Sequence, residues 1–274
     1  MTIGEALMQG IALLKSNGIE PPRLTAELLL CHALQKPKIY LFSHSGDELT
    51  ELAWIHYGRY LHERIAGKPV QYITGRQEFY MRDFAVRPGV LIPRPETEHL
   101  VEFVLSLPRP LGKILDAGVG SGAICVTLAA ELGQVVYGVD REEPPLQVTS
   151  QNATQHQANV KLWQGDWLSA VRPRSIDIFV SNPPYIALTA KPTLQREVRD
   201  HEPDRALFAG VDGMDAYRIL EAQARQVLKP GGIIALEIGD AATKEIFQSW
   251  DNLKLTNDLA GRPCLLTATL PASA

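Results

Sequence analysis

The tetrapeptide Asn182-Pro183-Pro184-Tyr185 follows a short, branched apolar run at residues 176–180. Such a run is typical of a buried parallel strand, and it must end here because neither proline can donate a hydrogen bond to a sheet. Ligands of open α/β sheets bind at this end of the strands. The Asn182 side-chain oxygen and the Pro183 carbonyl could each accept one hydrogen of an NH2 group, while Tyr185 packs against its flat remainder. The alternative is a turn that only ends a strand.

A glycine-rich turn lies between an expected strand at residues 114–116 and an expected helix at residues 123–132. Glycine lets the backbone turn tightly and approach a ligand closely. A strand before the turn and a helix after it are the context that a nucleotide-binding loop requires, although a packing role is open too. The residues expected to contact a cofactor here are Gly118, Val119, Gly120, Ser121 and Gly122.

Two acidic residues follow the next two expected strands. Asp140 ends the second strand, 22 positions after Gly118, where a carboxylate commonly accepts both hydroxyls of a ribose. A helix cap is the alternative for Asp140. Asp166 and Trp167 follow the third strand, and an acid beside a large ring suits the amine and the face of an adenine. These residues predict an adenosine-containing cofactor.

The spacing of the glycines bears on which cofactor this is. Loops that bind a nicotinamide dinucleotide usually have the sequence Gly-x-Gly-x-x-Gly. Here the spacing between the last two glycines, Gly120 and Gly122, is one residue shorter, and no phosphate-binding lysine or arginine follows. The acidic and polar residues at the strand ends, Asp116 included, resemble class I S-adenosylmethionine-dependent methyltransferases. The Asn-Pro-Pro-Tyr turn narrows the resemblance to enzymes that methylate adenine amino groups in nucleic acid or glutamine side chains in protein.

Several segments outside this shared core carry a more specific signal: Pro69–Gly75, Glu78-Phe79, Leu91-Ile92-Pro93-Arg94-Pro95-Glu96-Thr97-Glu98, Glu202-Pro203, Leu236–Gly239 and Asp258–Arg262. With them, nearly the whole chain resembles the peptide chain release factor glutamine methyltransferase (HemK/PrmC) family. Two places depart from the family pattern. Ala117 and Val119 stand where Leu and Thr are usual, and Pro263-Cys264 replaces a polar residue and Arg.

The resemblance implies methyl transfer from S-adenosylmethionine, giving S-adenosylhomocysteine, without a metal. Its acceptor is the glutamine of the Gly-Gly-Gln motif in bacterial class 1 release factors. Asn182, Pro183 and Tyr185 are the expected catalytic residues, with Pro184 a further substrate contact and Asn182 also a cofactor contact. Glu237, near the end of a later strand, is the nearest acid, and a buried structural role is equally open.

The predicted fold is a Rossmann-like α/β methyltransferase domain at residues 93–274, mostly parallel with an antiparallel C-terminal edge. A helical substrate-recognition domain at residues 1–70 precedes it, joined by a β-hairpin linker at residues 71–92. Within these domains the pattern predicts a short strand at 70–73, a turn at 229–232 and a helix at 243–250. The stretch from 186 to 213 is expected to be irregular.

Composition limits the partners. The 274 residues are 45% hydrophobic and carry a net charge of -4, and residues 93–274 hold 17 basic and 22 acidic side chains. That balance disfavours duplex DNA, whose binding depends on phosphate neutralisation. Three separated cysteines, no membrane-length apolar run and no basic N-terminal signal predict a cytoplasmic protein, by default a monomer. A ribosomal-protein glutamine methyltransferase and a non-catalytic S-adenosylmethionine-binding module remain as alternatives.

Overall fold

The computed structural model describes residues 1–272 and divides the chain into two compact units. The first unit consists of Met1–Arg76 together with Gln195–His201. The second consists of Gln77–Leu194 and residues 202–272. No helix among residues 1–272 is both long and apolar enough to cross a bilayer. Each unit has buried apolar clusters of its own.

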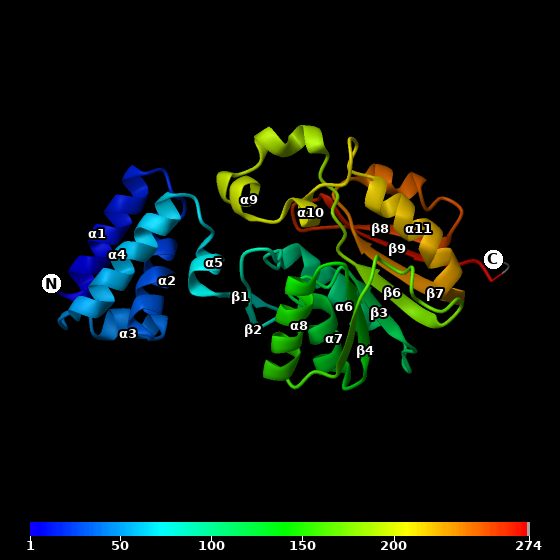
Figure 1. Ribbon diagram of the computed structural model, residues 1–274, viewed down its shortest axis with the longest axis horizontal. Coiled ribbons are helices and arrows are strands. Elements are labelled where there is room, and N and C mark those ends of the chain that lie inside the picture. Colours follow the sequence, from blue (N-terminus) through cyan, green and yellow to red (C-terminus); the bar gives the residue numbers. More distant parts are fainter. Residues whose placement is uncertain (273–274) are drawn as a thin grey trace. The chain divides into compact units, whose positions relative to one another are not determined.

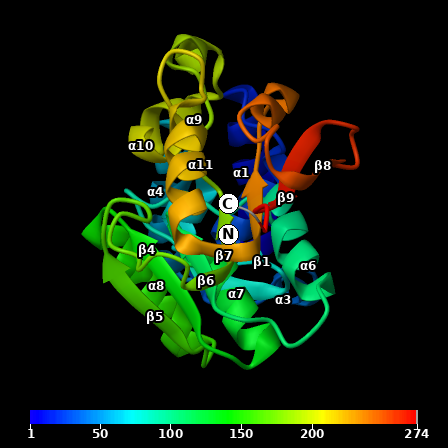
Figure 2. The same ribbon diagram turned by 90° about the vertical axis from the view of Figure 1, so that its right-hand side faces the viewer.

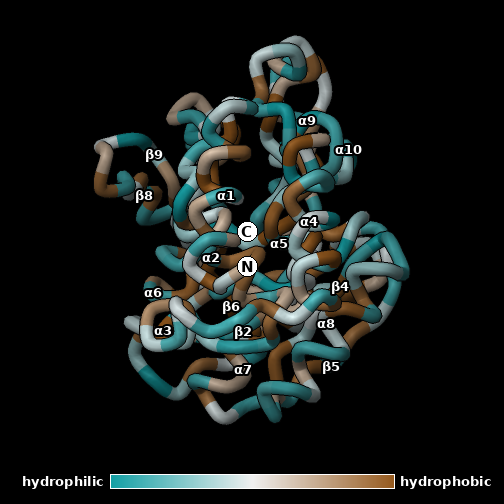
Figure 3. The backbone as a smooth tube through the Cα atoms, turned by 90° about the vertical axis from the view of Figure 1, so that its left-hand side faces the viewer, coloured by the Kyte–Doolittle hydropathy of each residue, from teal (hydrophilic) through white to brown (hydrophobic). Residues whose placement is uncertain are grey.

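The first unit is helical, and hydrophobic and hydrophilic residues alternate along its chain (Figure 3). Thr2 begins the first helix with a capping box, in which its hydroxyl accepts from the Glu5 N–H and its own N–H donates to the Glu5 carboxylate. Tyr57 is fully buried, and a Cβ at Gly10 would lie 1.9 Å from its hydroxyl oxygen. Glycine therefore permits close helix packing here. The helices are α1 Ile3–Ser16, α2 Pro22–Leu34, α3 Lys38–Ser43, α4 Glu51–Ile65, α5 Val70–Thr74 and α9 Arg196–His201.

The expected strand at residues 70–73 is wrong, because α5 is a short helix. Pro69 stands at its N-cap, and Gly75 ends it in the left-handed conformation with its N–H bonded to the Gln71 carbonyl. Five apolar-rich residues do not distinguish strand from helix, whereas the bracketing proline and glycine suit a helical turn. The expected hairpin follows as β1 Arg76–Phe79 and β2 Arg82–Ala85.

The second unit holds a seven-stranded sheet in the order β5-β4-β3-β6-β7-β9-β8. Strands β3 to β7 pair in parallel, and β9 pairs antiparallel with both β7 and β8. The predicted parallel sheet with an antiparallel C-terminal edge is confirmed, and Figure 2 shows β5 and β8 at opposite edges. The strands are β3 Ile114–Ala117, β4 Val136–Asp140, β5 Val160–Gln164, β6 Ile176–Ser181, β7 Leu228–Glu237, β8 Asp251–Asn257 and β9 Pro263–Thr269.

Helices cover both faces of this sheet. The helices α6 Glu98–Ser106, α7 Ala123–Leu132 and α8 Glu143–Gln155 lie on one face, and α11 Asp215–Val227 lies on the other (Figure 1). After β3 the chain builds outward through β4 and β5, then returns to the other side of β3 with β6. This reversal is a topological switch point, where open α/β sheets bind ligands beyond the carboxyl ends of the strands.

Two other predictions in this unit need correction. Residues 229–232 belong to β7, and the register passes from Ile176↔Leu228 to Ile178↔Ile233, so the expected turn is a bulge within a continuing strand. The expected helix at 243–250 is only the 3-10 helix η3 Ala241–Glu245 followed by turns. Asp240 caps η3 through the Ala242 N–H. A 3-10 helix this short forms without the regular apolar stripe by which a longer α-helix packs against the core.

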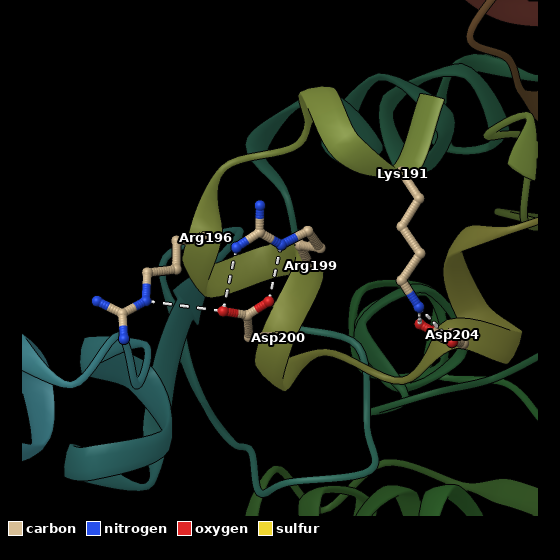
Figure 4. A network of polar contacts seen from close by, with 5 residues as sticks. All are labelled: Lys191, Arg196, Arg199, Asp200 and Asp204. Carbon is tan, nitrogen blue, oxygen red and sulfur yellow. Dashed lines mark hydrogen bonds and ion pairs between the residues drawn. The ribbon is translucent and has the colours of Figure 1, made fainter. Parts of the chain in front are cut away.

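The stretch expected to be irregular contains short helices. They are η2 Leu188–Thr193, α9 and α10 Asp204–Leu207, and η1 Pro95–Thr97 is a similar turn before α6. On α9, the Asp200 carboxylate pairs with Arg199 at 2.8 Å and with Arg196 at 3.6 Å. Lys191 separately pairs with Asp204 at 2.7 Å (Figure 4). These pairs are exposed, so each adds little to stability, on the order of 1 kcal/mol or less.

Candidate active site

A cavity of about 650 Å³ opens at the carboxyl ends of the parallel strands. Its wall includes most of the residues that the sequence predicted to bind a cofactor: Gly118, Val119, Gly120, Ser121, Asp140, Asp166, Trp167 and Asn182. Pro184 and Thr97 also line it, whereas Gly122, Pro183 and Tyr185 are not among its lining residues. The tertiary structure thus brings together residues from the ends of four strands.

The glycine turn after β3 adopts a conformation that glycine alone adopts readily. Gly118, Gly120 and Gly122 have φ of +77°, +57° and +83°. The Gly118 N–H donates to the Val139 carbonyl at 2.8 Å, which joins the turn to β4. A Cβ at Gly122 would lie 2.8 Å from the Thr149 methyl carbon, so this glycine serves packing against α8. Gly118 and Gly120 have no side chains, so at these two positions the backbone itself forms the cavity wall.

Asp140 is fixed by two backbone donors. Its Oδ2 accepts from the Gly120 N–H at 3.1 Å and its Oδ1 from the Glu142 N–H at 3.0 Å. Burial raises the pKa of Asp140 to about 6, although hydrogen bonds from the backbone of Gly120 and Arg141 lower it, so the carboxylate is mostly ionised at neutral pH. Each oxygen keeps further acceptor capacity. An acceptor of this kind fits a pair of ribose hydroxyls, which are donors.

Trp167 closes the side of the cavity near the glycine turn. Its φ is +52°, uncommon for a bulky residue, and its ring lies 3.4 Å from the position of a Cβ on Gly118. Such backbone strain persists only where surrounding contacts hold the residue in place. The ring and the neighbouring Asp166 offer a flat apolar surface and an acceptor, which fit an adenine base.

Asn182 connects the end of β6 to the proline-rich segment before α6. Its Nδ2 donates to the Thr97 hydroxyl at 3.1 Å. The preceding Ser181 is buried, and its hydroxyl donates to the Ala117 carbonyl at 2.6 Å, which ties the end of β6 to β3. Among residues 1–272 no donor contacts the Asn182 Oδ1, so this oxygen is available to a ligand.

Tyr185 packs tightly behind the turn. A Cβ on Gly239 would lie 2.5 Å from its ring carbon Cδ2 and 2.9 Å from Cε2, so only glycine at position 239 leaves room for the ring. Its hydroxyl donates to the Glu237 Oε1 at 3.4 Å. Burial raises the pKa of Tyr185 far above its ordinary value, and the negative charge of Glu237 raises it further. The phenol is therefore neutral.

Glu237 is buried behind Thr97 and is not part of the cavity wall. Its Oε2 accepts from the Thr97 hydroxyl at 2.6 Å, and its backbone carbonyl accepts from the Tyr217 hydroxyl at 2.9 Å. Burial raises the pKa of Glu237 to about 7 despite the hydrogen bond from Thr97. Of the two roles that the sequence left open, its position favours a structural one over direct contact with a ligand.

Sequence reasoning missed the partners that hold the proline-rich segment and the hairpin. Arg94 pairs with the buried Glu202, which also accepts from the Ile92 N–H at 3.3 Å. Asn152 on α8 accepts from the Ala85 N–H at 2.8 Å and donates to the Ser121 carbonyl at 2.8 Å. Asn and Glu in these positions resemble ordinary surface residues, and only their burial distinguishes them.

The structure shows no preformed metal site in the part of the chain it describes. No group of three or more His, Cys, Asp or Glu residues among residues 1–272 is arranged to hold an ion. The three cysteines, Cys31, Cys125 and Cys264, are buried and unpaired with one another. The polar groups at the cavity are instead a carboxylate, an amide and backbone groups.

Comparison with known proteins identifies the family. Residues 5–75 match the PrmC N-terminal domain family, and residues 109–265 match a methyltransferase domain family. A release factor glutamine methyltransferase from Koribacter versatilis (strain Ellin345) is 43% identical over 280 residues, covering 100% of both chains. The chain belongs to the release factor glutamine methyltransferase family. A second member, from Moorella thermoacetica, is 41% identical over 273 residues and 96% of each chain.

Solved structures agree with this methyltransferase fold. A methyltransferase from Pyrococcus furiosus superposes with a TM-score of 0.53 at 18% identity, over 78% of this family member and 99% of that chain. The catalytic domain of hMettl16, solved in complex with the MAT2A 3′UTR hairpin 6, superposes with a TM-score of 0.54 at 17% identity. The match covers 69% of this chain and 75% of that chain. At these identities the likeness establishes the fold alone.

Proposed function

We propose that this protein transfers a methyl group from S-adenosylmethionine to the side-chain amide nitrogen of the glutamine in the Gly-Gly-Gln motif of class 1 peptide chain release factors. The observation that carries the proposal is the Asn182 amide at the wall of the cavity. Its nitrogen is anchored, and no donor among residues 1–272 contacts its oxygen. Full-length identity of 43% to a release factor glutamine methyltransferase supports the choice of substrate.

The residues around the cavity fit the cofactor. Asp140 would accept from the ribose hydroxyls, Asp166 and Trp167 would hold the adenine, and the turn at Gly118–Gly122 would allow the cofactor to approach the backbone. S-adenosylmethionine supplies an electrophilic methyl group on a positively charged sulfur. The proposed chemistry therefore needs no metal ion and no cysteine.

The protein's own part is to hold the acceptor nitrogen. An amide nitrogen is a poor nucleophile because its lone pair is delocalised into the carbonyl. The Asn182 Oδ1 and the Pro183 carbonyl would each accept one N–H of the glutamine and so point the nitrogen toward the methyl donor. Two fixed acceptors also stabilise the positive charge that develops on that nitrogen. Alignment is the larger effect, since oriented reactants reach effective molarities of ~10⁵ M or more.

Tyr185 and the prolines support this arrangement. Pro183 and Pro184 have no N–H to compete for the acceptors, and the Tyr185 ring, wedged against Gly239, provides a flat apolar wall that excludes water. No general base is required before transfer, because the proton can leave the alkylated nitrogen afterwards. Tyr185 itself remains protonated, since burial raises its pKa.

The remaining parts of the chain complete the proposal. The helical segment at residues 1–70 would receive the release factor, the segment at residues 71–92 would connect it, and residues 93–274 would carry the reaction. We propose a monomer that works in the cytoplasm without binding nucleic acid directly. The net charge of -4 is compatible with a protein substrate.

Methyl transfer from a labelled cofactor tests the function. Purified protein is incubated separately with a class 1 release factor, a ribosomal-protein fraction and adenine-containing DNA, and mass spectrometry locates the label. We expect it on the release factor glutamine, and Asn182→Ala should lower the rate by 100-fold or more, on the order of the loss of a positioned group at a reaction centre. Label on DNA or on a ribosomal protein, with none on the release factor, contradicts the proposal.

A further inference from the structure

Thr97 contacts two groups of the candidate site at once. Its hydroxyl donates to the Glu237 Oε2 at 2.6 Å and accepts from the Asn182 Nδ2 at 3.1 Å. Thr97 and Glu237 are each 3% exposed, so neither bond competes freely with water. Hydrogen bonds linked in such a buried chain strengthen one another and hold one arrangement.

The single proton of the Thr97 hydroxyl decides which way the Asn182 amide faces. An ionised Glu237 carboxylate can only accept, so the hydroxyl proton points toward it. The Thr97 oxygen can then only accept, and the NH2 end of the Asn182 amide is the donor that satisfies it. The Asn182 Oδ1 is consequently held at the opposite end of the amide, where no residue among 1–272 donates to it.

We propose that Thr97 and Glu237 are positioning residues that set the orientation of the Asn182 amide, so that its oxygen faces the substrate nitrogen. This inference rests on the proposed function, because an NH2 substrate needs an acceptor. A flipped amide would present two donors to a group that itself donates, and the substrate N–H would lose its partner. Glu237 thus acts through Thr97 without touching the substrate.

The same chain of hydrogen bonds makes the orientation depend on pH. A protonated Glu237 donates to Thr97, whose own proton then turns to Asn182 and favours the flipped amide. Burial raises the pKa of Glu237 to about 7, which places this change near neutrality. Both tyrosines near it stay neutral, since burial raises their pKa. The charged or titratable groups that face Glu237 are Arg94, Glu96, Tyr185, Tyr217 and Cys264.

The first test compares three threonine variants. Thr97→Val removes the hydroxyl at nearly constant shape, and Thr97→Ser keeps it. Thr127→Val is the matched control, because the buried Thr127 hydroxyl on α7 has no hydrogen-bond partner among residues 1–272. For Thr97→Val we expect kcat to fall about tenfold, the loss typical of one hydrogen bond, with cofactor affinity within about twofold of the parent. Thr97→Ser and Thr127→Val should retain kcat within about twofold.

The pH profile adds a readout that a purely structural role would not change. The parent should lose kcat as pH falls through about 7, whereas in Thr97→Val the link to Asn182 is broken and this acid limb should disappear. Equal kcat values for Thr97→Val and Thr127→Val, or an unchanged acid limb in Thr97→Val, overturn the proposal.

A measurement on the protein alone separates this inference from the proposed function. The sequence contains six asparagines, so selective ¹⁵N labelling gives few side-chain NH2 signals, and the Asn182 pair is assigned by its loss in Asn182→Ala. In the parent, one proton of this pair should exchange at least several-fold more slowly than in Thr97→Val. Equal exchange in both proteins refutes the positioning role even if the parent methylates release factors. Slow exchange without methylation of release factors refutes only the proposed function.

Discussion

Replacing Gly239 by alanine tests whether the position of the Tyr185 ring controls the reaction. The added Cβ would lie 2.5 Å from the ring carbon Cδ2 and 2.9 Å from Cε2. Carbon atoms in good contact are about 3.5 Å apart or more, so the ring must move by about 1 Å. A displacement of this size at a reaction centre can lower the rate by about 10²-fold. Overpacking should also destabilise the protein by about 1–3 kcal/mol.

The assay measures kcat and KM with a release factor, cofactor affinity by calorimetry, and the free energy of unfolding in urea. Gly46→Ala is the matched control, because a Cβ there meets no atom within 4 Å and the backbone is not in the left-handed region. We expect kcat of Gly239→Ala to fall about 100-fold and that of the control to stay unchanged. Cofactor affinity should change little, since Tyr185 does not line the cavity.

A double variant tests whether the Tyr185 ring itself causes the loss of stability in Gly239→Ala. Adding Tyr185→Ala to Gly239→Ala removes the atoms that overlap, so the double variant should be less destabilised than the sum of the two single variants. Its activity should stay low, because the wall behind the substrate is gone. Full activity in a correctly folded Gly239→Ala protein would show that the ring position does not control the reaction. A loss of stability in the double variant equal to the sum of the two single losses would show that Gly239 and Tyr185 are not in close contact.

Three further predictions concern other parts of the molecule. Asp140→Asn should weaken cofactor binding by roughly 10–100-fold in calorimetry, since it removes a charged acceptor that two backbone N–H groups now hold; unchanged affinity would place the ribose elsewhere. Burial raises the folded-state pKa of Asp116 to about 7, so its contribution to stability is lost as pH rises through 7. The stability of Asp116→Asn relative to the parent should therefore increase by about 1 kcal/mol between pH 6 and pH 8 in urea titrations, and a pH-independent difference would contradict this. Gly58 lies inside α4 with open space around it, so Gly58→Ala should stabilise the protein by about 0.5–1 kcal/mol, and a lower unfolding midpoint would contradict this.

Local patterns accounted for most of the fold. Prolines after residues 176–180 end β6 where the sequence predicted it to end, and the glycine turn follows β3 as expected. Two segments differ from the form that the sequence predicted. The apolar run at Val70–Thr74 became α5 because its capping residues suit a helix. Lys229–Gly232 stayed within β7 because β6 pairs with β7 on both sides of the bulge, at Leu228 and at Ile233.

The candidate site was also predictable only in part from the sequence. The cavity gathers Asp140, Trp167 and Asn182, which the sequence could predict because the ends of parallel strands meet at one edge of a sheet. The roles of Thr97 and Glu237 could not be predicted, because they depend on contacts between residues 85 and 140 positions apart in the chain.

The amino-acid sequence by itself determined the carboxyl ends of the parallel strands, the glycine turn, the family and the groups able to accept an NH2 hydrogen, because each depends on neighbouring residues or a recurring spacing. Only the tertiary structure decided which of those groups is anchored and which remains free. The direction of a hydrogen bond depends on what the other atoms of a buried network donate and accept, and that is known only when distant segments have packed together.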